Sequence, residues 1–232
     1  MKKRFCIINF NPLKTGLLPG INQLLSILAV TLSFLPLILY WWKKLAVDKA
    51  YMVISIFWTI NGILYTPEIF HWDWYLVATN QITLFYNLID APMIFLIFYY
   101  IFRKKIFLIL IPVFVLFETI MIAWKGFNFD SNNYIIGLGS LICLILNIWG
   151  LSKYFMKVEH TERENALVFV YAGFIFYYGL FAVIFNYNYL QTSGPQKPYV
   201  EFVNYSAICL ANLLISFGFW KYAHTEYQDE SY

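Results

Sequence analysis

Seven long windows of the sequence carry almost no charge, and this pattern constrains the fold more than any other feature. Two of the windows hold a single acid each, Asp90 within 74–102 and Glu118 within 106–124. The other five hold no charged residue: 15–42, 50–67, 131–152, 165–196 and 202–220. A helix needs about 20 apolar residues to cross the roughly 30 Å hydrocarbon core of a bilayer. The windows therefore predict membrane-spanning helices.

The composition agrees with this interpretation. Of the 232 residues, 61% are hydrophobic and 12% are charged, whereas a soluble domain is about 25% charged. A net charge of +3 is too small and too dispersed to predict nucleic-acid binding. Three cysteines do not predict a disulfide scaffold or a zinc cluster. We expect an all-α integral membrane protein whose main partner is the lipid bilayer, in the cell membrane, which is the inner membrane if the source is bacterial.

Turn signals divide the chain into two tails and one bundle of seven predicted spans. Residues 1–20 form the N-terminal tail, residues 21–222 the bundle, and residues 223–232 the C-terminal tail. The second span is the least secure, because it is short and contains Asn61 and Gly62. The seven spans lie near 21–42, 50–66, 77–102, 105–124, 134–156, 165–190 and 200–222.

Local motifs support several of these boundaries. Thr161 followed by Glu164 has the spacing of a capping box and predicts the start of the sixth span. Gly126 and the polar residues 130–133 predict a turn before the fifth span. Only residues 103–105 separate the third and fourth spans, which predicts a tight antiparallel pair.

Lysine and arginine counts predict the orientation, because cytoplasmic loops are enriched in these residues. Ten lie on the side of the odd-numbered loops and the C-terminus, and six lie on the other side, four of them in the N-terminal tail. We therefore expect the N-terminus outside and the C-terminus in the cytoplasm. The ten are Lys43, Lys44, Lys49, Arg103, Lys104, Lys105, Lys153, Lys157, Arg163 and Lys221.

The sequence also contains a weak sign of an internal repeat. When the sequence is aligned with itself so that Gly62 pairs with Gly179, the first three spans align with the last three without a gap. In this alignment Phe85 pairs with Phe202. This suggests a 3+1+3 parallel repeat, a plan found in small transporters. The alternative is that seven helices of similar length overlay in any case.

Asp90 and Glu118 are the main functional candidates, because an acid near the bilayer centre needs a partner, a water-filled cavity or a proton. Asp90 lies 13 residues before Arg103, and Glu118 lies 13 residues after Lys105. A rise of 1.5 Å per residue puts both about 20 Å from the hairpin that joins their helices. If both face the seam, they would share one proton. The alternative is that one or both are structural hydrogen-bond donors.

Other polar residues are expected near the same level of the membrane. Asn87 shares a helical stripe with Asp90, while Asn61, Tyr177, Tyr178 and Asn212 lie on other spans. Together they predict a polar pocket that binds a ligand or a proton. The alternative for each asparagine is simple helix–helix adhesion, worth about 0.6 kcal/mol on average.

The loop after the second span is predicted to lie outside. Glu68, His71 and Asp73 make it acidic and Trp72 and Trp74 make it aromatic. It is interpreted either as an access site for a solute or as an interfacial belt. His71 alone does not predict a metal site.

Several kinds of chemistry find no support in the sequence. No histidine lies within a span, and no phosphate-binding loop is present, so we expect neither a metal, nor a cofactor, nor an enzyme. The topology resembles that of retinal proteins, and the segment from Asp90 to Pro92 looks like their counterion helix. The last span, however, has no lysine in its middle, where such proteins attach retinal; Asn212 stands there and Lys221 lies at the end.

Three function classes follow. The first is a protein that binds a small solute or an amphipathic ligand in the intrabundle pocket, with transport coupled to protons. The second is a seven-helix receptor or sensor that acts through a membrane or cytoplasmic partner protein, since the loops are too short to carry an output domain. The third is a non-catalytic structural membrane subunit.

Overall fold

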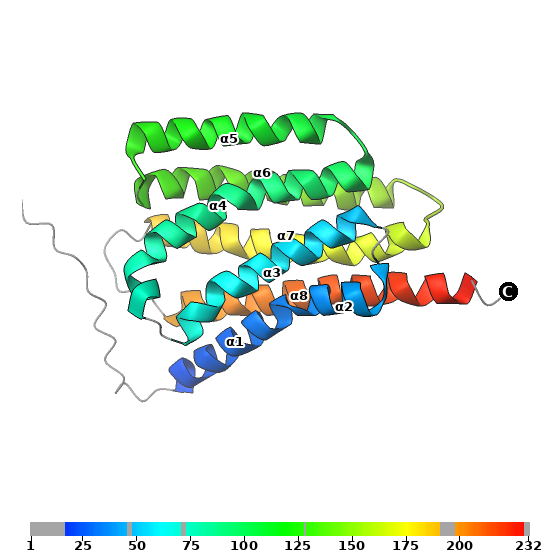
Figure 1. Cartoon of the computed structure of the whole chain (residues 1–232), viewed down its shortest axis with the longest axis horizontal. Coiled ribbons are helices and arrows are strands. Elements are labelled where there is room, and N and C mark those ends of the chain that lie inside the picture. Colours follow the sequence, from blue (N-terminus) through cyan, green and yellow to red (C-terminus); the bar gives the residue numbers. More distant parts are fainter. Residues whose placement is uncertain (1–16, 46–47, 71–72, 128, 191–197, 230–232) are drawn as a thin grey trace, which may run out of the picture.

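The computed structural model describes residues 17–45, 48–70, 73–127, 129–190 and 198–229. Every element in this part of the chain is a helix, and the helices lie side by side as one bundle (Figure 1). In chain order they are α1 (Leu17–Ser33), α2 (Leu35–Trp42), α3 (Lys49–Ile69), α4 (Asp73–Phe102), α5 (Ile106–Lys125), α6 (Phe129–Phe155), α7 (Glu162–Leu190) and α8 (Pro198–Asp229).

Six segments of the described chain are long and apolar enough to cross a membrane, so the multi-pass all-helical architecture is confirmed. The first of them includes both α1 and α2, which Pro36 separates because proline cannot donate the next helical hydrogen bond. The six are Gly20–Trp42, Gln81–Phe102, Ile106–Lys125, Ser131–Phe155, Glu162–Ile184 and Glu201–Tyr222.

Helix α3 is the predicted second span, and it is not one of these six. Its 21 residues would cover about 31 Å, but its composition is less apolar because Ser55, Thr59, Asn61 and Thr66 interrupt the hydrophobic run. The helix is nonetheless central, since Tyr51 and Trp58 have no exposed surface. Seven spans are therefore not confirmed, and the repeat and the orientation stay predictions.

One expected turn is wrong. Residues 130–133 were expected in a turn but lie inside α6, which begins at Phe129. The last candidate span ends at Tyr222, and residues 223–229 of the predicted C-terminal tail continue the same helix, α8, to Asp229. Two other boundaries are confirmed. The Glu164 carboxylate accepts a hydrogen bond from the backbone N–H of Thr161 at 3.0 Å, and the Thr161 hydroxyl accepts one from the backbone N–H of Glu164 at 3.2 Å. Gly126 ends α5 with a φ of 86°.

The packing partners define a ring of helices. α3 packs against α1, α2 and α4; α6 packs against α4 and α7; and α8 closes the ring between α7 and α1. Helix α5 lies outside the ring against α4 and α6, and it forms one edge of the bundle in Figure 1. Its only buried side chains form one stripe: Phe107, Phe114, Glu118 and Met121.

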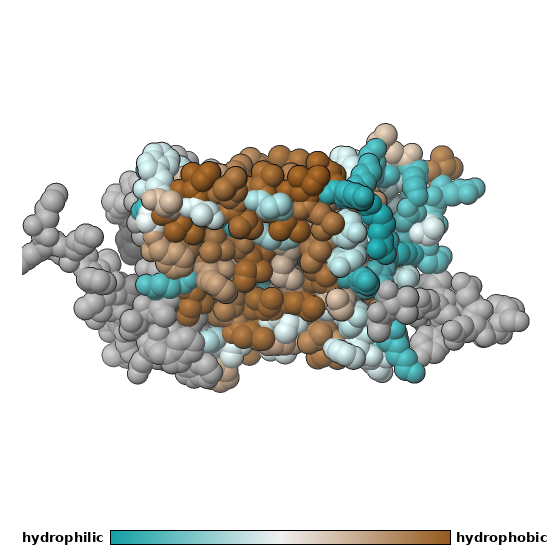
Figure 2. Space-filling model, turned by 45° about the horizontal axis from the view of Figure 1, so that its top comes forward, coloured by the Kyte–Doolittle hydropathy of each residue, from teal (hydrophilic) through white to brown (hydrophobic). Residues whose placement is uncertain are grey.

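The surface has the pattern expected of a membrane protein. A hydrophobic band covers the middle of the bundle, and hydrophilic residues gather at one end (Figure 2). That end holds the α4–α5 and α6–α7 connections, where Arg103, Lys104, Lys105, Lys153 and Lys157 are exposed. Such a band matches the hydrocarbon region of a bilayer.

Helices α7 and α8 approach each other unusually closely at two glycines. A Cβ atom on Gly173 would lie 2.8 Å from the carbonyl oxygen of Ala211, and one on Gly218 would lie 2.7 Å from that of Ala166. Small residues of this kind allow helix backbones to pack tightly within a membrane. The close α7–α8 contact therefore depends on having glycine, which has no side chain, at positions 173 and 218.

An ion pair joins the start of α3 to the start of α7 at the basic end. Arg163 donates from Nε to Oδ2 of Asp48 and from Nη2 to Oδ1 at 3.2 Å, so the pair is bidentate. The side chain of Asp48 is 12% exposed and that of Arg163 is 29% exposed. The pair is thus partly shielded from water and should be stronger than a surface salt bridge.

We expect a double-mutant cycle of Asp48→Asn and Arg163→Gln to give a coupling energy of about 1–2 kcal/mol, between the values of exposed and buried pairs. The measurement is the free energy of unfolding of the purified protein in detergent. The Lys157–Glu164 pair is the matched control, because Lys157 is 54% exposed, and its coupling should be smaller. A coupling near zero for Asp48 and Arg163 would contradict this interpretation.

Candidate functional site

Asp90 lies on α4 in the interior of the ring, and two tyrosines bind its carboxyl group. Tyr178 of α7 donates its hydroxyl to Oδ1 at 2.9 Å, and Tyr86, one turn before Asp90 on α4, donates to the same oxygen at 3.4 Å. The neighbouring residue Ala91 is buried in the core. The acid therefore lies in an apolar bundle and is stabilised there by hydroxyl donors.

The hydrogen bonds continue from Asp90 to α3. The Nδ2 atom of Asn61 donates to the hydroxyl of Tyr86 at 2.7 Å and to that of Tyr177 at 3.4 Å. The hydroxyls of Tyr86 and Tyr177 also lie 3.4 Å apart. One network thus joins α3, α4 and α7 around Asp90.

A cavity of about 70 Å³ lies beside this network. By the same measure one water needs roughly 10–15 Å³, so the cavity has room for about five waters or one small solute. It is lined by Tyr65, Thr83, Tyr86, Asn87, Asp90, Ala91, Ile135, Ile136, Gly139, Ser140, Tyr177, Tyr178 and Phe181.

A second polar contact lies at the cavity wall between α4 and α6. Asn87 donates from Nδ2 to Oδ1 of Asn132 at 2.8 Å. Asn132 is buried and was expected in a turn rather than in a span. Asn87 therefore lines the cavity as expected, but its hydrogen bond also fits the alternative of helix–helix adhesion.

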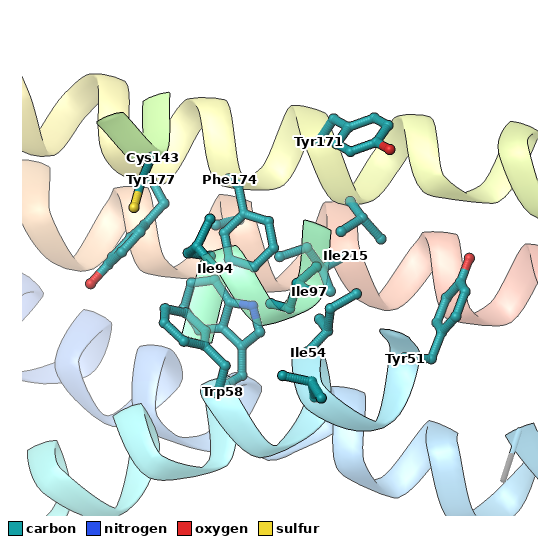
Figure 3. Close-up of a cluster of buried hydrophobic side chains, with 14 of the residues drawn as sticks. Tyr51, Ile54, Trp58, Ile94, Ile97, Cys143, Tyr171, Phe174, Tyr177 and Ile215 are labelled. Carbon is teal, nitrogen blue, oxygen red and sulfur yellow. The ribbon is translucent and has the colours of Figure 1, made fainter. Parts of the chain in front are cut away.

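A dense aromatic layer lies between the cavity and the basic end of the bundle. Trp58 contacts Tyr177 and Phe174, with ring centroids 5.2 and 6.0 Å apart. Phe98 contacts Tyr171 at 6.0 Å, one helical level closer to the basic end. Figure 3 shows Trp58 and Phe174 packed with Ile94 and Ile97, while the hydroxyl of Tyr177 points away from them. The polar network is thus separated from the basic end by apolar packing.

Glu118 is buried but is not one of the residues that line the cavity. Glu118 is 2% exposed, and its Oε1 atom has no hydrogen-bond partner among the described residues. Within the described part of the chain no hydrogen bond joins it to Asp90, although Asp90 is near enough to act on it electrostatically. The proposed sharing of one proton therefore has no direct contact to support it.

Asn212 lies in a different part of the bundle. It donates from Nδ2 to the Ser33 hydroxyl at 3.3 Å and to the Ile208 carbonyl at 3.0 Å. These contacts join α8 to α1, and Asn212 does not line the cavity. Its arrangement is that of a residue that holds two helices together.

Only part of the predicted outer access loop lies among the residues that the structure describes. Glu68 lies at the end of α3 and Asp73 begins α4, so the loop between the helices is short. His71 lies outside the described residues, as do the side-chain surroundings of Glu68 and Asp73. A role of these three in solute access stays a prediction.

Four of the lining residues, Asn87, Asp90, Tyr177 and Tyr178, are among the site residues expected from the sequence, whereas the aromatic residues Tyr65, Tyr86 and Phe181 are not. Tyr86 had a usable signal, because it precedes Asp90 by four residues and must lie on the same helix face. Among the described residues, no group of three His, Cys, Asp or Glu side chains is placed to hold a metal ion. Comparisons with protein-family models, curated proteins and solved structures gave no match.

Proposed function

We propose that this protein is a small carrier that binds a polar solute and a proton at Asp90 and moves them across the membrane. In this proposal α3 completes a seven-helix bundle with the N-terminus outside and the C-terminus in the cytoplasm. The observation that carries the proposal is an acid inside the bundle that lines a cavity and has hydroxyl donors but, among the described residues, no basic partner.

The charge of Asp90 is the first argument. Asp90 is half-buried, and no described residue that lines the cavity is basic. A carboxylate without a counter-ion is costly in a low-polarity environment, and it responds by taking up a proton or by pairing with a cation. The hydrogen bonds from Tyr178 and Tyr86 stabilise the charged form in part. Asp90 therefore has the properties of a group that alternates between two charge states during a transport cycle.

The size of the cavity is the second argument. Sites for drug-sized ligands measure about 300–1,000 Å³, whereas this cavity offers about 70 Å³. An amphipathic ligand would not fit without a large rearrangement. The geometry therefore favours a solute of a few non-hydrogen atoms.

The position of the cavity is the third argument. Along α4 it extends from Asp90 to Thr83, away from the end that holds Arg103. The aromatic layer around Trp58 and the Asp48–Arg163 ion pair close the other half of the bundle. A site closed on one side is what one state of an alternating-access carrier requires.

We expect proteoliposomes with a trapped pH-sensitive dye and an imposed pH gradient to respond to one charge class of small solute. The three test solutes are glycerol, methanesulfonate and guanidinium, because none of them carries a proton through lipid as a weak acid or base. One of them should change the lumen pH with the wild-type protein and not with empty liposomes. A receptor or a structural subunit would leave the lumen pH unchanged with all three, and that result would contradict the carrier.

A further inference from the structure

We infer that the solute is a small organic cation, which pairs with the Asp90 carboxylate and takes the place of its proton. This inference rests on the proposed function and names the class of its substrate. Three features of the cavity support it: the charge of its lining, the free oxygen of Asp90 and the aromatic rings around it.

The lining carries one formal charge, and that charge is negative. Asp90 is the single acid among the described lining residues, and none of those residues is a lysine, arginine or histidine. An anionic solute would be repelled, and a neutral solute would leave the carboxylate uncompensated. A cation compensates it. The titratable groups around Asp90 are Tyr65 of α3, Tyr86 of α4, Glu118 of α5, Cys143 of α6, and Tyr177 and Tyr178 of α7.

The carboxyl group of Asp90 keeps an acceptor for a solute. Both tyrosine hydroxyls bond to Oδ1, and within the described chain no side-chain hydrogen bond ends on Oδ2. An N–H group of an ammonium or guanidinium ion can donate to that oxygen. Hydrogen bonds between two charged groups are about twice as strong as those between neutral groups.

Aromatic rings surround the place where the cation would lie. Four tyrosines and Phe181 line the cavity. Tyr177 packs edge-on against Tyr178 with centroids 5.0 Å apart and stacks with Phe181 at 6.4 Å. The negative face of an aromatic ring attracts a cation within about 6 Å of its centroid. Among the described lining residues no cationic side chain is present that could pair with an anion.

The exchange is balanced in charge. When a cation enters, the O–H bond of the Asp90 carboxyl group breaks and the proton leaves to water, so one positive charge replaces another. No oxidant, reductant or further reactant is needed. Cation and proton would then move in opposite directions, one for one, and the cycle would be insensitive to the membrane potential.

The test uses three planar solutes of four non-hydrogen atoms each: guanidinium, urea and acetate. They differ in charge and hardly in size. Calorimetric titration of the purified wild-type protein, with guanidinium far below denaturing concentrations, should show saturable binding of guanidinium alone. A weakly buffered sample should release protons in parallel. Equal binding of urea, or binding of acetate alone, would overturn the inference.

Variants separate the contributions of the charge and the rings. Asp90→Asn should weaken guanidinium binding more than tenfold and stop proton release, while Glu159→Gln, an exposed acid on the α6–α7 connection, should bind as the wild type does. Phe181→Leu keeps the charge and removes one ring, and it should weaken binding about two- to fivefold. Unchanged binding in Asp90→Asn that elutes as a folded monodisperse protein would overturn the inference.

The two proposals fail differently. If methanesulfonate or glycerol moves protons in proteoliposomes and guanidinium does not bind, the carrier stands and the cation is wrong. If guanidinium binds but no solute moves protons, the pocket binds cations without transport. In that case the proposed carrier function is wrong, and the inferred binding of a cation stands.

Discussion

Proteoliposomes that contain the Asp90→Asn variant are expected to show no solute-driven proton movement above that of empty liposomes. Asparagine has nearly the same shape as aspartate, and its Oδ1 atom can still accept the Tyr178 hydroxyl that lies 2.9 Å away. It cannot bind a proton or carry a charge, however. The variant should therefore keep the cavity and lose the group on which exchange depends.

The matched control for this variant is Glu159→Gln, which makes the same chemical change at an exposed position outside the bundle. It should leave proton movement at the wild-type rate. Tyr178→Phe removes one donor to Asp90 and should have an intermediate effect, because Tyr86 still bonds to the same oxygen. Wild-type proton movement in Asp90→Asn would exclude Asp90 as the exchanging group.

The largest effect on stability is expected at the α7–α8 contact. Gly218→Ala places a methyl group 2.7 Å from the Ala166 carbonyl oxygen, and Gly173→Ala places one 2.8 Å from that of Ala211. A backbone atom cannot move aside as a flexible side chain can, so the two helices must separate. Overpacking of this kind costs about 1–3 kcal/mol, and we expect each variant to lie near the upper end.

The measurement is the free energy of unfolding in detergent, and Gly179→Ala is the matched control on α7. A Cβ atom there would meet only the Leu144 side chain, at 3.9 Å. This control should be neutral or stabilising by up to about 1 kcal/mol, because alanine is more favourable than glycine in a helix interior when its methyl group has room. Equal stability of Gly218→Ala and Gly179→Ala would show that the glycines do not set the α7–α8 distance.

The features that the sequence predicted well are those set by composition along one helix. Long charge-free windows locate apolar helices, because a charge inside the bilayer is costly. The Thr161–Glu164 capping box was predicted for the same reason: its two residues satisfy each other's backbone N–H groups within one turn. Neither prediction required knowledge of how the helices are arranged around one another.

The predictions that failed or found no support concern burial and the rotation of helices about their axes. Residues 130–133 are polar and so resembled a turn, but Asn132 is buried because its amide pairs with Asn87 across two helices. Asn212 was expected in the same polar layer as Asp90, but its side chain donates to Ser33 on α1. Glu118 faces the interior from α5, which lies outside the ring, so equal depth did not place it in the cavity with Asp90.

Helix α3 shows the opposite case, in which a weak sequence signal belongs to a central element. Its hydropathy is lowered by polar residues, and one of these, Asn61, donates hydrogen bonds to Tyr86 and Tyr177. A helix that contributes to a polar site inside a bundle gains little from being uniformly apolar. The residue that made the second span insecure is thus part of the network around Asp90.

Infrared difference spectroscopy between acid and alkaline pH tests the central claim, that Asp90 holds an exchangeable proton, most directly. The purified protein should show the carbonyl band of a protonated carboxyl group, which is absent from Asp90→Asn and which guanidinium abolishes in the wild type. The spectrum of the Glu118→Gln variant, measured under the same conditions, identifies any band that belongs to Glu118. A spectrum in which the wild type and Asp90→Asn have the same carboxyl bands would contradict the account.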